Sequence, residues 1–256
     1  MLVRTARTAA LCCALIVATA LAGPAQAKPA AKGPYAAALA DPARPAGERD
    51  RDATRLPGQL LAFAQIDKGE KVGDFIMGGG YLTRILAVAV GPEGHVYAFQ
   101  PAEFIGFRAQ YGIDQKTVDD AYGNVDAVAG SAPAPAWPVA LDTIVTVQNF
   151  HDLYLKQAAP GTGARAAANL FAALKRGGTL VVVDHFAPDG SGSTLSDSLH
   201  RIDRKTVVDT MTAAGFRLEA ESKLWRQPAD PRTTNVFDPA IRGKTDQFAL
   251  RFRKPR

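Results

Sequence analysis

The chain has 256 residues, of which 47% are hydrophobic, and a formal net charge of +5. This length and composition are typical of one α/β domain with a substantial core. The charge is too small and too dispersed to indicate a nucleic-acid partner, and the basic residues between Arg251 and Arg256 are more typical of a solvated end than of a binding patch.

Residues 1–27 predict a secretory signal peptide. Arg4 and Arg7 precede an apolar run from 9 to 22, and Ala25-Gln26-Ala27 has the small residues of a cleavage site. We therefore expect export to the periplasm or the extracellular space. The run is shorter than a membrane span of roughly 20 residues, and we expect no span in the mature chain. Both cysteines lie inside the signal, which excludes disulfides and cysteine chemistry from the mature protein.

The next 20 residues, 28–47, are rich in alanine and proline and predict a loosely ordered arm. From Glu48 to Arg256 we expect a single domain. It begins with a charged segment and an amphipathic helix near Leu60 and Ile66, with Pro57 at a turn.

The segment from Lys71 to Tyr81 predicts a buried strand followed by a glycine loop that opens a helix. Glycine lets the backbone turn sharply and approach a ligand, and free amides at the start of a helix favour an anionic group. An apolar face from Tyr81 to Ala89 supports that helix, and Gly91-Pro92 ends it. The alternative is that the three glycines only make a strand-to-helix turn.

Beyond this loop, strand patterns alternate with helix patterns. The expected strands are 96–100, 125–129, 142–148, 179–184, 216–223 and 247–252, and the clearest helices are 163–174 and 206–214. Alternation of this kind predicts a doubly wound, mostly parallel sheet covered on both faces. Ligands of such sheets bind at the carboxyl ends of the strands.

Three segments resemble the class I S-adenosylmethionine-dependent methyltransferases, within them a group of predicted methyltransferases with exported members. The first is the glycine loop, where Asp74, Gly78 and Gly80 match the family pattern and Ile76 stands where a glycine is usual. The second, 174–184, is similar to the family's basic-Gly-Gly turn and fifth strand, and the third, 213–218, to the turn into strand six. The resemblance runs from about Glu48 to Arg253.

This resemblance implies a Rossmann-like seven-stranded sheet in which one strand near the C-terminus is antiparallel and lies between the fifth and sixth strands. It also implies S-adenosylmethionine as cofactor. The residues that would bind it are Asp74, Met77, Gly78, Gly79, Gly80, Gln100, Ser131 and Asn149. Gln100 stands in place of the family's acidic ribose ligand, with Glu103 three residues on, and Ser131 in place of the aspartate that holds the adenine. An amide and a hydroxyl can still make those hydrogen bonds, without charge assistance.

The candidate chemistry lies after the fourth strand, in Asn149-Phe150-His151-Asp152. We interpret His151 as a base for a hydroxyl or amine acceptor, with Asp152 as its catalytic partner and Phe150 as a shield for the sulfonium. The alternative is that Asn149 or Asp152 caps the next helix and His151 is structural.

Further histidines should lie on the same rim, because strands four and five are neighbours. His185 follows the fifth strand, and His200 follows a Gly-Ser-rich segment, 188–194, that we interpret as a flexible lid. The three histidines and Asp184 leave a metal site open as an alternative, although no tight ligand motif supports one. His95, on the opposite edge, is predicted to be structural.

The leading hypothesis is methyl transfer to a small-molecule acceptor that the sequence does not identify. Because this donor is made in the cytosol, an alternative is an exported ligand-binding module that has lost catalysis. A nicotinamide-dependent Rossmann enzyme ranks last, since the loop lacks a full Gly-x-Gly-x-x-Gly and no acidic residue ends the second strand. The sequence does not predict the oligomeric state.

Overall fold

The structure is a computed structural model that describes residues 33–256. The predicted signal peptide and the first residues of the predicted arm lie outside the described residues. The strands, in chain order, are β1 (Lys71–Phe75), β2 (His95–Phe99), β3 (Val125–Val128), β4 (Gly130–Ser131), β5 (Ala134–Pro135), β6 (Leu141–Val147), β7 (Leu174–His185), β8 (Arg217–Ser222) and β9 (Gln247–Arg253).

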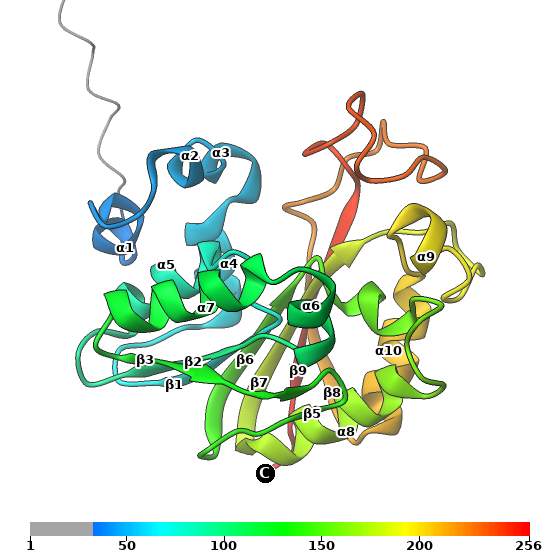
Figure 1. The fold of residues 1–256 in the computed structure, drawn as a ribbon. Helices are drawn as coiled ribbons and strands as arrows, with labels where there is room; N and C mark the ends of the chain where they lie inside the picture. Colours follow the sequence, from blue (N-terminus) through cyan, green and yellow to red (C-terminus); the bar gives the residue numbers. More distant parts are fainter. Residues whose placement is uncertain (1–32) are drawn as a thin grey trace, which may run out of the picture. The chain divides into compact units, whose positions relative to one another are not determined.

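Helices fill most of the connections between the strands (Figure 1). They are α1 (Ala36–Ala40), α2 (Ala46–Arg49), α3 (Asp52–Arg55), α4 (Pro57–Ala64), α5 (Tyr81–Val90), α6 (Ala102–Phe107), α7 (Gln110–Ala121), the 3-10 helix η1 (Phe150–Tyr154), α8 (Thr162–Ala173), α9 (Ser196–Leu199) and α10 (Arg204–Ala213). None of the helices in residues 33–256 is long and apolar enough to cross a membrane.

Seven strands form one sheet in the order β3-β2-β1-β6-β7-β9-β8. All neighbouring pairs are parallel except those of β9, which is antiparallel to both β7 and β8. The predicted mostly parallel sheet is therefore confirmed, with the antiparallel strand inserted near the C-terminus. The remaining two strands, β4 and β5, form a separate two-stranded hairpin.

Both faces of the central strands β1, β6 and β7 are buried, which explains why these strands are largely apolar, whereas the edge strand β8 is mostly exposed. Along β7, Leu180 and Val182 pack in one core cluster with residues of α8 and α10. Val181 and Val183 point the opposite way, into a second cluster with residues of α4 and α5. Successive side chains of a strand alternate between faces, so each cluster takes every second residue.

The predicted arm is more ordered than its composition indicates. Its described part, 33–47, contains α1, and Arg44 is fully buried in a forked ion pair with Asp52. The same carboxylate accepts a hydrogen bond from the hydroxyl of Tyr81, the first residue of α5. The expectation of a loose arm was wrong for this part, because Arg44 and Asp52 tie it to the helix that follows the glycine loop.

The strand β7 begins earlier than predicted, at Leu174, which the helix pattern had assigned to α8. Gly177 has a φ of +78°, and its amide bonds to the carbonyl of Lys254. These backbone bonds to the C-terminal segment extend the strand through the basic-Gly-Gly turn. Its carboxyl end, together with those of β1, β2, β3 and β6, forms the rim where ligands of such sheets bind.

Candidate functional site

The glycine loop, residues Ile76–Gly80, follows β1. Along it, every second residue has a positive φ. Ile76, Gly78 and Gly80 have φ values of +65°, +58° and +83°. Positive φ carries little cost for glycine but is strained for a β-branched residue. Ile76 thus keeps the backbone conformation of a glycine at the place where the sequence departs from the methyltransferase pattern.

The three glycines have different surroundings. A Cβ at Gly78 would meet nothing within 4 Å, and one at Gly79 would meet only Asp114, at 3.7 Å. At Gly80 a Cβ would lie 2.5 Å from a methyl group of Val118 and 2.9 Å from the Arg84 guanidinium. Gly80 is therefore required for packing, whereas Gly78 and Gly79 border open space.

Two of the predicted cofactor residues point into the protein. Asp74 is buried and accepts a 2.7 Å hydrogen bond from the Thr83 hydroxyl, which joins β1 to α5. Burial raises the pKa of Asp74 to about 6, although the bond from Thr83 opposes the shift. Met77 is buried in the cluster of α4 and α5. Both side chains hold the glycine loop in place, and their contact with a ligand stays a prediction.

Gln100 shapes the glycine loop directly. Its Oε1 accepts a 2.9 Å hydrogen bond from the amide of Gly78. Its Nε2 is buried and has no hydrogen-bond partner among the described residues. A buried donor without a partner is costly and indicates a missing acceptor.

Ser131 and Asn149 border the same rim. Ser131 is half-buried in β4, next to Ala132, whose amide donates to the Glu103 carboxylate. Asn149 uses its side-chain nitrogen to donate to the carbonyls of Ile76 and Val147, each at 2.8 Å. It therefore ties the glycine loop to the end of β6. Neither Asn149 nor Asp152 caps η1 through its side chain, so the capping interpretation was wrong.

His151 is almost completely buried beside Asp184, at the end of β7. Its Nδ1 lies 2.7 Å from Asp184 Oδ1, and its backbone amide donates to Asp184 Oδ2 at 2.8 Å. Burial alone would lower the pKa of His151, but the carboxylates of Asp184 and Asp152 raise it to about 10. The contact with Asp184 therefore fixes the orientation of the His151 ring, and its role as a base stays a prediction.

Asp152 and His200 complete the group that we call the histidine cluster: His151, Asp152 and His200. His151 Nε2 lies 3.3 Å from His200 Nδ1 and 3.2 Å from Asp152 Oδ1, and these last two atoms are 3.6 Å apart. Burial would raise the pKa of Asp152, but its hydrogen bonds with the two histidines lower it to about 2. The side chain of His200 is 25% exposed.

The other candidates near the histidine cluster are placed differently. The ring of His185 lies 6.0 Å from that of His151, but its Nδ1 bonds to the Thr245 hydroxyl at 2.8 Å, and burial lowers its pKa to about 3. Phe150 is buried in the core against Tyr154, so it cannot shield a ligand on the rim. The predicted convergence of His151, His200 and Asp184 is confirmed. The ring of His185 lies nearby but bonds to Thr245 instead of joining the cluster.

The Gly-Ser-rich segment 188–194 is not a loose lid. The amide of Gly190 donates to the Asp203 carboxylate, and the amide of Asp203 donates to the carbonyl of Gly192. Turns within the segment add further backbone bonds, such as Thr194 to Ser191. These contacts fix the segment that leads to His200.

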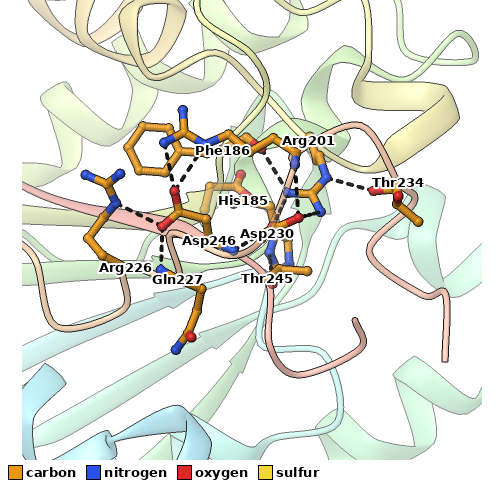
Figure 2. A network of polar contacts seen from close by, with 11 residues as sticks. His185, Phe186, Arg201, Arg226, Gln227, Asp230, Thr234, Thr245 and Asp246 are labelled. Carbon is orange, nitrogen blue, oxygen red and sulfur yellow. Dashed lines mark hydrogen bonds and ion pairs between the residues drawn. The ribbon is translucent and has the colours of Figure 1, made fainter. Parts of the chain in front are cut away.

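Figure 2 shows a polar network that contains Arg201, the residue after His200. Arg201 forms a forked ion pair with Asp230 at 2.8 and 3.0 Å, and both side chains are fully buried. Asp230 also accepts the amide of Asp246, whose carboxylate binds Arg226 and Arg232. This arginine–aspartate network fastens the long connection between β8 and β9 to the chain beside the histidine cluster.

Arg55 is a candidate that the sequence did not reveal. It lines a hollow beside the start of α5, together with Tyr81, Gln148 and Trp225. Its guanidinium lies 4.9 Å from the centre of the Tyr81 ring and donates to Gln148 Oε1 at 3.3 Å. No carboxylate of the described residues lies within ion-pair distance of it. Burial and the charge of Arg51 lower the pKa of Arg55 to about 10, which an added anion would reverse.

Comparison with known proteins supports the fold that this geometry indicates. No protein-family model matches the chain. A protein-L-isoaspartate O-methyltransferase from Ignicoccus hospitalis is 28% identical over 88 residues, which are 34% of this chain and 40% of that protein. The match thus spans well under half of this relative's length.

Solved structures resemble a much larger part of the chain. A SAM-dependent methyltransferase from Aquifex aeolicus has a TM-score of 0.52 and 17% identity, covering 82% of this chain and 98% of that one. The [4+2]-cyclase SpnF has a TM-score of 0.58 and 18% identity, covering 79% and 81%. Fibrillarin from Aeropyrum pernix, solved with S-adenosyl-L-methionine, has a TM-score of 0.50 and 15% identity, covering 79% and 76%. The chain therefore has the α/β fold of S-adenosylmethionine-dependent methyltransferases.

Proposed function

We propose that this protein binds S-adenosylmethionine on the glycine loop and transfers its methyl group to a small-molecule acceptor on the side of the histidine cluster. The observation that carries this proposal is the open space over Gly78 and Gly79 at the start of α5, on a sheet of this fold. Because one structural neighbour is a cyclase, the fold alone does not decide the reaction.

The residues of the loop fit such a donor. The amide of Gly79 has no hydrogen-bond partner in the described part of the chain, and it stands just before the first turn of α5. The buried Nε2 of Gln100 lacks an acceptor, which a ribose hydroxyl oxygen would supply. The exposed Gly79 just before α5 and the side chain of Gln100 would therefore offer donors from both backbone and side chain.

Arg55 fits the amino-acid end of the donor. It is a half-buried cation without a carboxylate partner in residues 33–256, and the hollow that it lines reaches Tyr81, directly after the glycine loop. A guanidinium in this position would bind a carboxylate through a charge-assisted hydrogen bond. We therefore assign Arg55 to the carboxylate of the donor.

The acceptor would lie on the other side of the rim. His200 is partly exposed there, and its ring packs edge-on against the exposed Phe237 at 4.8 Å. Such a donor, when bound, supplies a methyl group on a positively charged sulfur. The contribution of this chain is to hold both reactants in line, with Asn149 joining the glycine loop to the segment that carries His151.

Calorimetric titration tests donor binding. We expect the protein to bind S-adenosylmethionine and S-adenosylhomocysteine but not NAD. Gly78→Asn should weaken binding at least tenfold, because asparagine tolerates positive φ and its side chain would fill the open space. Gly69→Asn is the matched control, since Gly69 has a φ of +82° and open surroundings before β1. No binding at millimolar donor would refute the proposal and favour a module that has lost donor affinity.

The role of Arg55 has its own test. Arg55→Ala should weaken S-adenosylmethionine binding but leave unchanged the binding of 5′-methylthioadenosine, which lacks the amino-acid group. Arg51→Ala is the control, because Arg51 also lies over the Tyr81 ring but is exposed. Equal losses for both ligands in Arg55→Ala would exclude a contact with the carboxylate.

A further inference from the structure

Three side-chain atoms of metal-ligating type converge in the histidine cluster. His151 Nε2, His200 Nδ1 and Asp152 Oδ1 are separated by 3.2, 3.3 and 3.6 Å. They come from η1 and from the residue that ends α9, two segments that lie far apart in the sequence. The fold therefore brings together a set of ligands that no local motif displays.

These separations match the edges of a coordination tetrahedron. Zn²⁺ binds imidazole nitrogen and carboxylate oxygen at about 2.0–2.2 Å, so neighbouring ligand atoms of a tetrahedral site lie about 3.3–3.5 Å apart. Hydrogen bonds from nitrogen are shorter, typically about 2.9–3.0 Å. The rings of His151 and His200 stand at 86° to each other. The three atoms therefore stand at distances that one cation could bridge.

The surroundings of His151 are those of a metal ligand. Its Nδ1 is engaged by Asp184 at 2.7 Å, which leaves Nε2 to face the other two atoms. Metal-binding histidines usually donate their second ring nitrogen to a carboxylate in this way. Asp184 is itself fixed, because it accepts the backbone amides of His151 and His185.

His200 is held in a strained conformation next to a rigid anchor. Its φ is +54°, which is uncommon for a residue other than glycine. The following residue is Arg201, which is buried in the arginine–aspartate network. The backbone amide of His200 bonds to the carbonyl of Ser196, and the next strained residue of this region, Arg232, belongs to the same network. Strain that the surroundings maintain is typical of functional sites.

We propose that His151, Asp152 and His200 bind one divalent transition-metal cation, with Zn²⁺ as the ion that their spacing fits best. Two carboxylates, Asp152 and Asp184, balance its charge. Three protein ligands leave a fourth position, which the partial exposure of His200 leaves open to solvent. An ion there would polarise a bound acceptor oxygen or water. The site does not depend on the proposed methyl transfer, because its ligands are separate from the glycine loop.

Metal binding can be measured on the full chain without any assay of activity. After treatment with a chelator, the protein should bind one equivalent of Zn²⁺ by calorimetry and elemental analysis. Co²⁺ should give the visible absorption of a four-coordinate site. His200→Ala and Asp152→Asn should each weaken Zn²⁺ binding by more than about 100-fold, because removing even an outer partner typically costs about 10–100-fold.

His95→Ala is the matched control. His95 is a histidine in β2 whose only described ion pair is with Asp126, and this variant should bind Zn²⁺ like the original protein. Thermal unfolding shows whether each variant is folded, and Asp152→Asn decides if His200→Ala is not. Absence of stoichiometric binding, or equal binding by a folded His200→Ala or Asp152→Asn variant, would overturn the proposal.

Discussion

The glycine loop and the histidine cluster border the same edge of the sheet but keep their shape in different ways. Between Ile76 and Gly80 the shape lies in the backbone, with three positive φ values within five residues. The histidine cluster consists of side chains from distant segments, and buried groups such as Asp184 and Arg201 support it. One region is specified locally, whereas the other requires the whole fold.

This difference predicts how the two regions respond to substitution. In the glycine loop, Gly78 and Gly79 border open space, so changes there should affect ligand binding more than folding. Around the histidine cluster the polar groups are buried and mutually paired. Removing one of them leaves its partner unsatisfied, so stability should fall together with function.

The largest effect should come from Arg201→Met. Methionine roughly keeps the volume but leaves the fully buried Asp230 without its cation. Breaking a buried ion pair by removing one partner costs about 3–5 kcal/mol, and we expect the free energy of unfolding to fall by that amount. Denaturant unfolding measures it.

The control for Arg201→Met is Arg204→Met, three residues further on. Arg204 forms an ion pair with Glu221 in which both side chains are about one third exposed. Exposed pairs contribute at most about 1 kcal/mol, so the two variants should differ severalfold. Similar losses in both would show that the arginine–aspartate network is no stronger than a surface pair.

A smaller effect, visible in its dependence on pH, should come from Asp74→Asn. The pKa of Asp74 is raised from 3.8 to about 6 in the folded protein, so the folded state binds its proton more tightly than the unfolded state. This group therefore favours folding at low pH, and its contribution is lost as the pH rises from about 4 to 6. A shift of this size corresponds to on the order of 3 kcal/mol. Asp74→Asn should lack this slope in denaturant unfolding measured across that range.

Thr83→Val provides the complementary measurement. The Thr83 hydroxyl donates to Asp74, and this bond lowers the pKa that burial raises. Without the bond, the loss of stability should extend to higher pH. If the original protein and Asp74→Asn show the same slope between pH 4 and 6, the buried carboxylate does not titrate as described.

The fold could be predicted because its signals are local. Apolar strands, intervening amphipathic helices and the segment 174–184 give the order of elements, and β7 differs mainly by an earlier start. The arm was mispredicted because composition does not show that Arg44 pairs with Asp52. An ion pair that orders a segment depends on where the chain returns in space.

The site was only partly predictable for the same reason. The glycine loop follows from local sequence, and the placement of His151 beside His185 follows from the order of neighbouring strands. The sequence could not show that Asp184 would occupy Nδ1 of His151, or that Gln100 would bond to the loop itself. Arg55 was missed because it lies in a charged segment that is typical of a solvated helix, and only the fold places it beside Tyr81.

The smallest predicted effect separates the glycines of the loop from one another. Gly80→Ala should lower the free energy of unfolding by about 2 kcal/mol, because its Cβ would press against Val118 at a positive φ. Gly78→Ala should cost about 1 kcal/mol, since it has the same kind of backbone strain but meets no neighbour. Denaturant unfolding ranks the two. If Gly78→Ala were the more destabilising variant, the open space over Gly78 would be filled by the protein itself, and the loop would have no room for a donor.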